Sequence, residues 1–253
     1  MSPVNATASR RPLPMQGILA ALLFLALLVG VVFVWQRPPR PRAVAYEALL
    51  FDASRSVEQG NRCRDAYRIG AEIVSRAKGA TVRVTVFATG DARTGNEPVR
   101  LGVVALGHRG ALLEGRDTEA AVAVFRRELA ALCAGVALRN ESPVFRAAAA
   151  VLAILKQQSC GTDGVFCRLW VRTDLLDPIV ERAVRGKGRF HLPKLDNAGI
   201  EARFCGLSER RGRGAPLPVA DDLLRLLRRS FTNPEAVHVE PSCAAFAADG
   251  ATR

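Results

Sequence analysis

Apolar and polar positions follow three patterns along the chain. Residues 17–35 form an almost unbroken run of Leu, Ala, Val, Ile and Phe. Beyond it, short apolar or alternating stretches typical of strands occur at residues 44–51, 82–87, 100–106, 165–171, 200–207 and 237–239. Between them, apolar residues recur at helical spacing at residues 64–77, 117–133, 143–155, 175–184 and 221–231. Strands that alternate with helices of this length predict an α/β fold, with a mostly parallel sheet and helices on both faces. The turn at Gly95-Asn96 predicts that the second and third strands form a hairpin.

The first apolar run predicts a transmembrane helix at residues 17–36. No charged residue lies between Arg11 and Arg37, and nineteen helical residues extend roughly 28 Å, about the thickness of the bilayer hydrocarbon. The alternative is a cleaved secretory signal, but its apolar region is only about 7–15 residues long and ends at a small-residue site. We therefore predict four parts: an N-terminal tail at 1–16, the transmembrane helix at 17–36, a Pro/Arg linker at 37–43, and one folded domain at 44–253.

Cysteine usage indicates the compartment of this domain. Arginines flank the membrane segment on both sides, so the distribution of positive charge does not orient it. The chain has six cysteines, all beyond the membrane segment, and an even number there suits an oxidising, extracytoplasmic space such as the periplasm. Cys160 and Cys167 bracket a short Gly-containing loop, and we predict that they form a disulfide. The alternative is that cysteines such as Cys133 and Cys205 are small buried apolar residues. The sequence has no C-x-x-C motif, which argues against zinc.

The formal net charge of +12 does not by itself indicate nucleic-acid binding. The chain has Lys only at positions 78, 156, 187 and 194, and its many arginines are spread along the sequence in a background rich in Ala and Gly. The cluster at residues 210–213 offers cations for phosphate, but it has no interleaved aromatic residues and also fits a solvated loop. We predict no specific nucleic-acid partner, while an anionic protein surface stays open.

Oxygen-bearing side chains follow two of the predicted strands. Asp52, Ser54 and Ser56 come directly after the first strand, and Asp174 comes after the strand at 165–171. The carboxyl ends of parallel strands meet at one edge of the sheet, where ligands bind in open α/β folds. Ser142, before the helix at 143–155, completes a set of hard oxygen donors that suits Mg²⁺. Each residue also has a structural alternative as a turn residue or helix cap.

Residues 44–239 resemble the von Willebrand factor type A domain family, in its membrane-anchored bacterial form. Asp52-x-Ser54-x-Ser56 matches the metal-ion-dependent adhesion site motif of that family. Ser142 takes a position where the family generally has Thr, and Thr118 is the alternative for it. Leu175 stands where Gly is common after the second acid, and the terminal segment is short. The resemblance implies a doubly wound, Rossmann-like fold, a bound Mg²⁺ or Mn²⁺, and protein recognition in place of catalysis.

The leading hypothesis is a membrane-anchored module, not an enzyme, whose metal ion accepts an acidic side chain from a protein partner. A Mg²⁺-dependent phosphatase of the haloacid dehalogenase type, with Asp52 as its nucleophile, is one alternative. That family has a second Asp two residues on, where this chain has Ser54, so the general acid is missing. A structural envelope protein with a degenerate metal site is the other alternative.

Overall fold

The computed structural model describes residues 24, 26–27, 43–55, 57, 59–76, 80–90, 97–107, 116–137, 143–175, 192–207, 211–212, 215–216 and 221–244. By its contacts the chain divides into two units, Met1–Pro41 and Arg42–Arg253. Within the described residues, every helix is too short or too polar to cross a membrane. The predicted transmembrane helix at 17–36 lies almost wholly outside these residues, as do the tail at 1–16 and most of the linker at 37–43.

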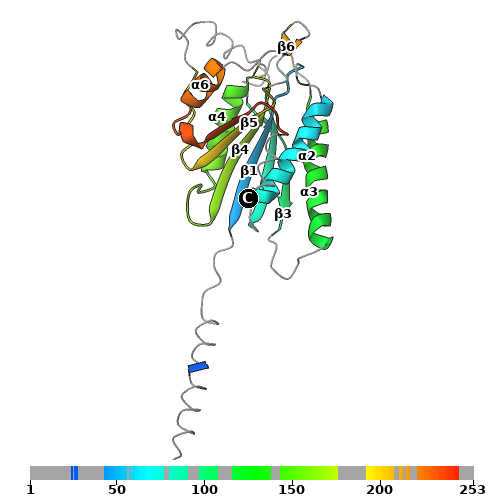
Figure 1. Cartoon of the computed structure of the whole chain (residues 1–253), viewed down its shortest axis with the longest axis vertical. Helices are drawn as coiled ribbons and strands as arrows, with labels where there is room; N and C mark the ends of the chain where they lie inside the picture. Colours follow the sequence, from blue (N-terminus) through cyan, green and yellow to red (C-terminus); the bar gives the residue numbers. More distant parts are fainter. Residues whose placement is uncertain are drawn as a thin grey trace, which may run out of the picture. The chain divides into compact units, whose positions relative to one another are not determined.

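The second unit is built on a six-stranded sheet. Its strands, in spatial order, are β3 (Val99–Leu106), β2 (Thr81–Ala88), β1 (Val44–Phe51), β4 (Val165–Arg172), β5 (Ile200–Cys205) and β8 (Val237–Glu240). All neighbours are parallel except β2 and β3, whose antiparallel pairing confirms the predicted hairpin. The chain builds outwards from β1 on one side, then crosses back to β4 and builds outwards on the other (Figure 1). This is the doubly wound, mostly parallel arrangement that the sequence predicted.

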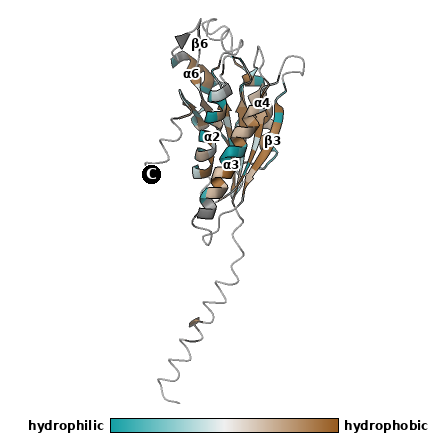
Figure 2. Cartoon of the chain, turned by 90° about the vertical axis from the view of Figure 1, so that its right-hand side faces the viewer, coloured by the Kyte–Doolittle hydropathy of each residue, from teal (hydrophilic) through white to brown (hydrophobic). Residues whose placement is uncertain are grey.

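Helices cover both faces of the sheet. Helices α2 (Gln59–Arg76) and α3 (Arg116–Ala134) lie on one side of it, and α4 (Val144–Lys156) and α6 (Asp221–Arg229) on the other (Figure 1). Side chains alternate along each strand, so β1 contributes to a separate apolar core on each face. Figure 2 shows hydrophobic and hydrophilic residues side by side on α2 and α3, as helices with one buried face require.

Three elements differ from the sequence expectation. Helix α2 begins at Gln59, about one turn before the predicted start at residue 64. The prediction missed this first turn because it is polar and carries no apolar periodicity. Strands β6 (Arg211–Gly212) and β7 (Ala215–Pro216) pair in the stretch that was expected to be a solvated loop. The predicted helix at 175–184 lies outside the described residues, apart from Leu175.

The domain contains two disulfides, Cys160–Cys167 and Cys205–Cys243. Cys160 and Cys167 are bonded, which confirms the predicted pair. Cys205, at the end of β5, is bonded to Cys243, beyond β8. The alternative that Cys205 is a free buried thiol is therefore wrong, because the parallel pairing of β5 and β8 brings Cys243 next to it. Neither bond includes Cys133, which is fully buried, or Cys63, which is partly buried.

Candidate metal site

The two acidic residues of the predicted site follow adjacent strands. Phe51 at the end of β1 pairs with Arg172 at the end of β4, and the backbone N–H of Asp52 donates to the carbonyl of Arg172 at 2.9 Å. Asp52 and Asp174 thus leave the sheet at the same edge, and their side chains are 1% and 0% exposed. We call this edge, formed by the residues that follow β2, β1 and β4, the rim.

Neutral hydrogen-bond donors orient the carboxylate of Asp52. Its Oδ1 accepts the backbone N–H of Ser54 at 2.8 Å, in the local turn that an Asp favours. Its Oδ2 accepts the hydroxyl of Thr173 at 2.6 Å. A carboxylate has about four acceptor positions, and these two bonds occupy two of them. Asp52 therefore has acceptor capacity left for a cation.

Leu175 completes this arrangement through an uncommon backbone conformation. Its φ is 53°, in the left-handed region that favours glycine. In that conformation its N–H donates to the hydroxyl oxygen of Thr173 at 2.9 Å, so the hydroxyl proton of Thr173 is directed to Asp52. The conformation gives a physical reason why the family commonly has Gly here. The side chain of Leu175 is fully buried, and this burial offsets the cost of the left-handed backbone.

Thr89 holds the loop that follows β1, from the side opposite Thr173. It follows β2 directly, its N–H donates to the carbonyl of Phe51, and its hydroxyl accepts the N–H of Ala53, both at 2.9 Å. The predicted site residues did not include Thr89 or Thr173. The signal for both was their position, because each follows a parallel strand directly, as Asp52 does.

Arg62 is a buried cation behind the loop. Its side chain is 0% exposed, and its Nη2 donates to the carbonyls of Ser54 at 3.2 Å and Val57 at 3.0 Å. Its Nε and Nη1 have no hydrogen-bond partner within the described part of the chain. Burial lowers the pKa of Arg62, and the nearby carboxylate of Asp52 opposes that shift. Sequence analysis did not single out Arg62, because it lies in the polar first turn of α2.

A second buried arginine lies beside the rim with its own counter-ion. Arg172 is 0% exposed, and its Nε lies 3.1 Å from Oδ2 of Asp65 on α2. Gly206, after β5, has a φ of +95°, and a Cβ there would lie 3.2 Å from both Cζ of Arg172 and the carbonyl oxygen of Thr173. Glycine is thus needed for β5 to approach β4 this closely.

The donors of the rim fit a hard divalent cation. Asp52, Ser54 and Asp174 offer only oxygen atoms, which suits Mg²⁺ or Mn²⁺. Within the described residues, no three His, Cys, Asp or Glu side chains are placed to hold a metal together, so such a site would also need hydroxyl ligands. Ser56 and Ser142, the predicted hydroxyl ligands, lie outside the described residues and stay predictions. Thr118, the alternative to Ser142, lies in the first turn of α3.

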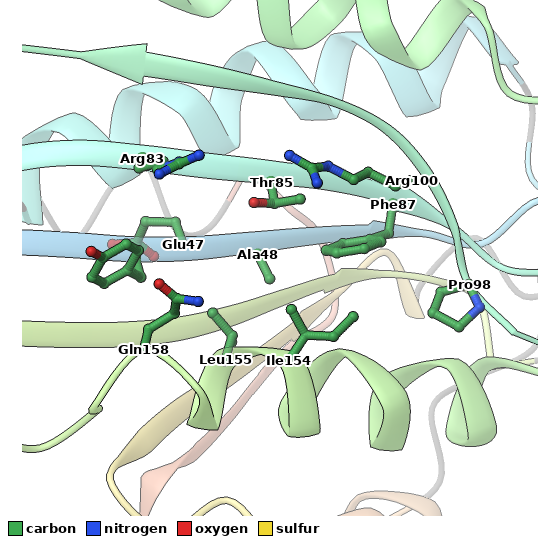
Figure 3. A pocket seen from close by; sticks show the side chains of 11 residues that line it. Glu47, Ala48, Arg83, Thr85, Phe87, Pro98, Arg100, Ile154, Leu155 and Gln158 are labelled. Atoms are coloured by element: carbon green, nitrogen blue, oxygen red, sulfur yellow. The ribbon is translucent and has the colours of Figure 1, made fainter.

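The structure also has a pocket of about 340 Å³ away from this edge. It lies over β1, between the β2–β3 hairpin and the end of α4, with Arg83 and Arg100 on one side and Ile154 and Gln158 on the other (Figure 3). The predicted metal ligands do not line this pocket. It is therefore separate from the candidate metal site.

Comparisons with known proteins support only the fold. No family model and no curated protein matches the sequence. Among solved structures, the chain is similar to the pilus adhesin SpaC from Lactobacillus rhamnosus GG, with 10% identity and a TM-score of 0.44 over 84% of this chain and 30% of the adhesin chain. It is also similar to the conserved hypothetical protein BatB from Bacteroides thetaiotaomicron, with 12% identity and a TM-score of 0.42 over 82% of this chain and 96% of that one.

A third similar structure is the manganese-loaded TRAP protein from Plasmodium vivax, with 12% identity and a TM-score of 0.39 over 82% of this chain and 71% of that one. The chain spans less than a third of the length of the adhesin, and no ligand or partner follows from likenesses at this level. The strand order and the crossover back to β4 establish a doubly wound α/β fold, which is the fold that the resemblance to the von Willebrand factor type A family implies.

Proposed function

We propose that this protein is a membrane-anchored module that binds a protein partner through a divalent cation, Mg²⁺ or Mn²⁺. The cation would be held by Asp52, Ser54, Ser56, Ser142 and Asp174. The observation that carries the proposal is the pair of buried carboxylates after the adjacent strands β1 and β4. A buried carboxylate without a cation is costly, and the hydrogen bonds that orient Asp52 come from neutral groups.

The charges at the rim favour an acidic partner. Asp52 and Asp174 contribute two negative charges and Arg62 one positive charge, while Arg172 and Asp65 form an ion pair. One negative charge is left, so a bound divalent cation would make the site positive by one. An Asp or Glu side chain from the partner neutralises that charge and supplies an oxygen ligand.

The anchor and the compartment belong to the same proposal. The apolar segment at 17–36 tethers the domain to the cell membrane. The domain lies on the extracytoplasmic side, in keeping with the disulfides Cys160–Cys167 and Cys205–Cys243, since such bonds persist in oxidising compartments. The protein acts by binding and not as an enzyme.

Thermal unfolding of the full chain in detergent, with and without metal, tests the metal site. Mn²⁺ or Mg²⁺ at about 100 times its Kd should stabilise the domain by about 2.7 kcal/mol, or roughly 5–10 °C in Tm. Asp52→Asn should abolish this shift, because the amide removes the charge and one acceptor. The matched control is Asp163→Asn, which removes an exposed carboxylate from the loop between α4 and β4 and should keep the full shift. A wild-type Tm that does not respond to either metal would favour a structural protein with a degenerate site.

Capture of partners from solubilised membranes tests recognition. The wild-type chain should retain a partner in Mg²⁺ and release it in excess chelator, whereas Asp52→Asn should retain none. Equal capture with and without chelator would refute metal-mediated binding. Mg²⁺-dependent hydrolysis of a phosphate ester that is lost in Asp52→Asn would instead support the phosphatase alternative.

A further inference from the structure

Helices α2 and α3 are closely joined along one face of the sheet. They lie side by side (Figure 1), and Arg126 of α3 donates from Nε to the carbonyl of Tyr67 of α2 at 3.0 Å. The guanidinium of Arg126 also lies 3.7 Å from the centre of the Tyr67 ring. At Gly70, an added Cβ would come within 3.0 Å of Leu129. The backbones of the two helices therefore approach closely.

This packing brings two cysteines together at one end of the helix pair. Cys63 lies near the start of α2 and Cys133 near the end of α3, 70 positions apart in the chain, and their Sγ atoms are 2.6 Å apart. Non-bonded heavy atoms in contact are normally about 3.5–4.0 Å apart, whereas a disulfide bond is about 2.0 Å long. The sulfur atoms are thus too close for two packed thiols. We propose that Cys63 and Cys133 form a third disulfide, which joins α2 to α3.

The exposure of the two cysteines suggests how the bond forms. Cys63 is partly exposed and Cys133 is fully buried, so an incoming disulfide reaches Cys63 first. The Cys63 thiolate attacks a small-molecule or protein disulfide, forms a mixed disulfide and releases one thiol. The Cys133 thiolate then attacks Cys63 and releases the second thiol. The two thiols of this chain lose two electrons and two protons, and the external disulfide gains them.

The bond would also stabilise the loop at the rim that Arg62 contacts. Arg62 directly precedes Cys63, and its guanidinium holds the carbonyls of Ser54 and Val57. A covalent link at Cys63 fixes the first turn of α2, from which Arg62 reaches that loop. The bond itself follows from the packing of the two helices, so it does not depend on metal binding at the rim.

Peptide mapping without reduction tests the bond. The full chain is purified from an oxidising compartment, denatured in an alkylating reagent without reductant, and digested with trypsin. Trypsin releases Cys133 in residues 128–139 and Cys160 with Cys167 in residues 157–168, while Cys205 and Cys243 fall in residues 204–210 and 230–253. We expect peptide 128–139 to be linked to the dipeptide 63–64. Alkylated Cys63 and Cys133 in molecules whose other two bonds are intact would overturn the proposal.

Single and double variants keep the test decisive. Cys133→Ala should leave one alkylatable thiol, at Cys63, and because alkylation is read on the denatured chain, the result does not require a stable variant. Cys63 linked to another cysteine of Cys133→Ala would count against a specific pair. The double variant Cys63→Ala with Cys133→Ala should melt roughly 5–15 °C below the wild type, because a disulfide that closes a long segment constrains the unfolded chain. An unchanged Tm would mean that the two helices are not cross-linked.

Discussion

Strand β1 carries one buried acid within it and another directly after it, and their partners differ. Glu47 is 1% exposed, its Oε1 lies 2.6 Å from Nη1 of Arg168, and its Oε2 accepts the indole N–H of Trp170 at 2.8 Å. Asp52 is equally buried, but its hydrogen bonds come from a backbone N–H and a hydroxyl. Glu47 thus has a direct counter-ion, whereas Asp52 has only neutral donors in direct contact.

The difference separates an acid that stabilises the fold from an acid available for binding. The charge of Glu47 is matched inside the sheet by a side chain of the neighbouring strand, so no cation is needed there. Near Asp52, the side chain of Arg62 donates to loop carbonyls instead. Burial alone therefore does not identify a functional acid, and the charge of its partners is the more informative property.

The largest expected effect is the loss of stability on removing Glu47. Glu47→Ala leaves Arg168 without its closest counter-ion and the Trp170 indole without an acceptor, so the free energy of unfolding at pH 7 should fall by about 3–5 kcal/mol. Asp52→Asn should cost only about 1 kcal/mol, because the amide keeps one acceptor oxygen. Urea unfolding of both variants checks the comparison. Equal losses would mean that Asp52 is as structural as Glu47.

The next effect is a pH dependence of stability. Burial raises the pKa of Glu47 from 4.5 to about 7, against the lowering effects of Arg168 and Trp170. Between these values the folded chain binds more protons than the unfolded chain, so this contribution is complete below about pH 4.5 and is lost as the pH rises to about 7. The loss is on the order of 3 kcal/mol.

The control for this pH dependence is Glu47→Gln, which cannot titrate. The wild type should lose stability relative to this variant as the pH rises from about 4.5 to 7. The difference between the two proteins also removes the contribution of His238, whose pKa is lowered by burial and by Arg203. Parallel curves for the two proteins over this range would contradict the assignment.

The smallest expected effect concerns the backbone at Leu175. Leu175→Ala keeps the left-handed conformation and removes a fully buried side chain, so it should cost about 2–5 kcal/mol. Leu175→Gly removes slightly more of the side chain but relieves the backbone, so it should be about 1 kcal/mol more stable than Leu175→Ala. The order of the two unfolding free energies is the measurement. At a position with ordinary φ the order would be reversed, since Gly then costs about 0.5–1 kcal/mol relative to Ala.

The elements were well predicted from the sequence where burial has a simple period. The strands at 44–51 and 165–171 and the helix at 143–155 match β1, β4 and α4 within one residue at either end. The early start of α2 was not predicted, because Arg62 is buried by contacts with the segment that follows β1 and not by an apolar pattern. The position of the two acids after adjacent strands was predictable from parallel topology.

The alternation of strands and helices, the acids that follow β1 and β4, and the short-range disulfide Cys160–Cys167 could all be predicted from the amino-acid order. These depend on periodicity and on neighbours along the chain. The groups that hold Asp52, the left-handed conformation of Leu175 and the cysteines that meet across the domain became known only from the folded chain. Those contacts join residues far apart in the chain, and they exist only once strands pair and helices pack.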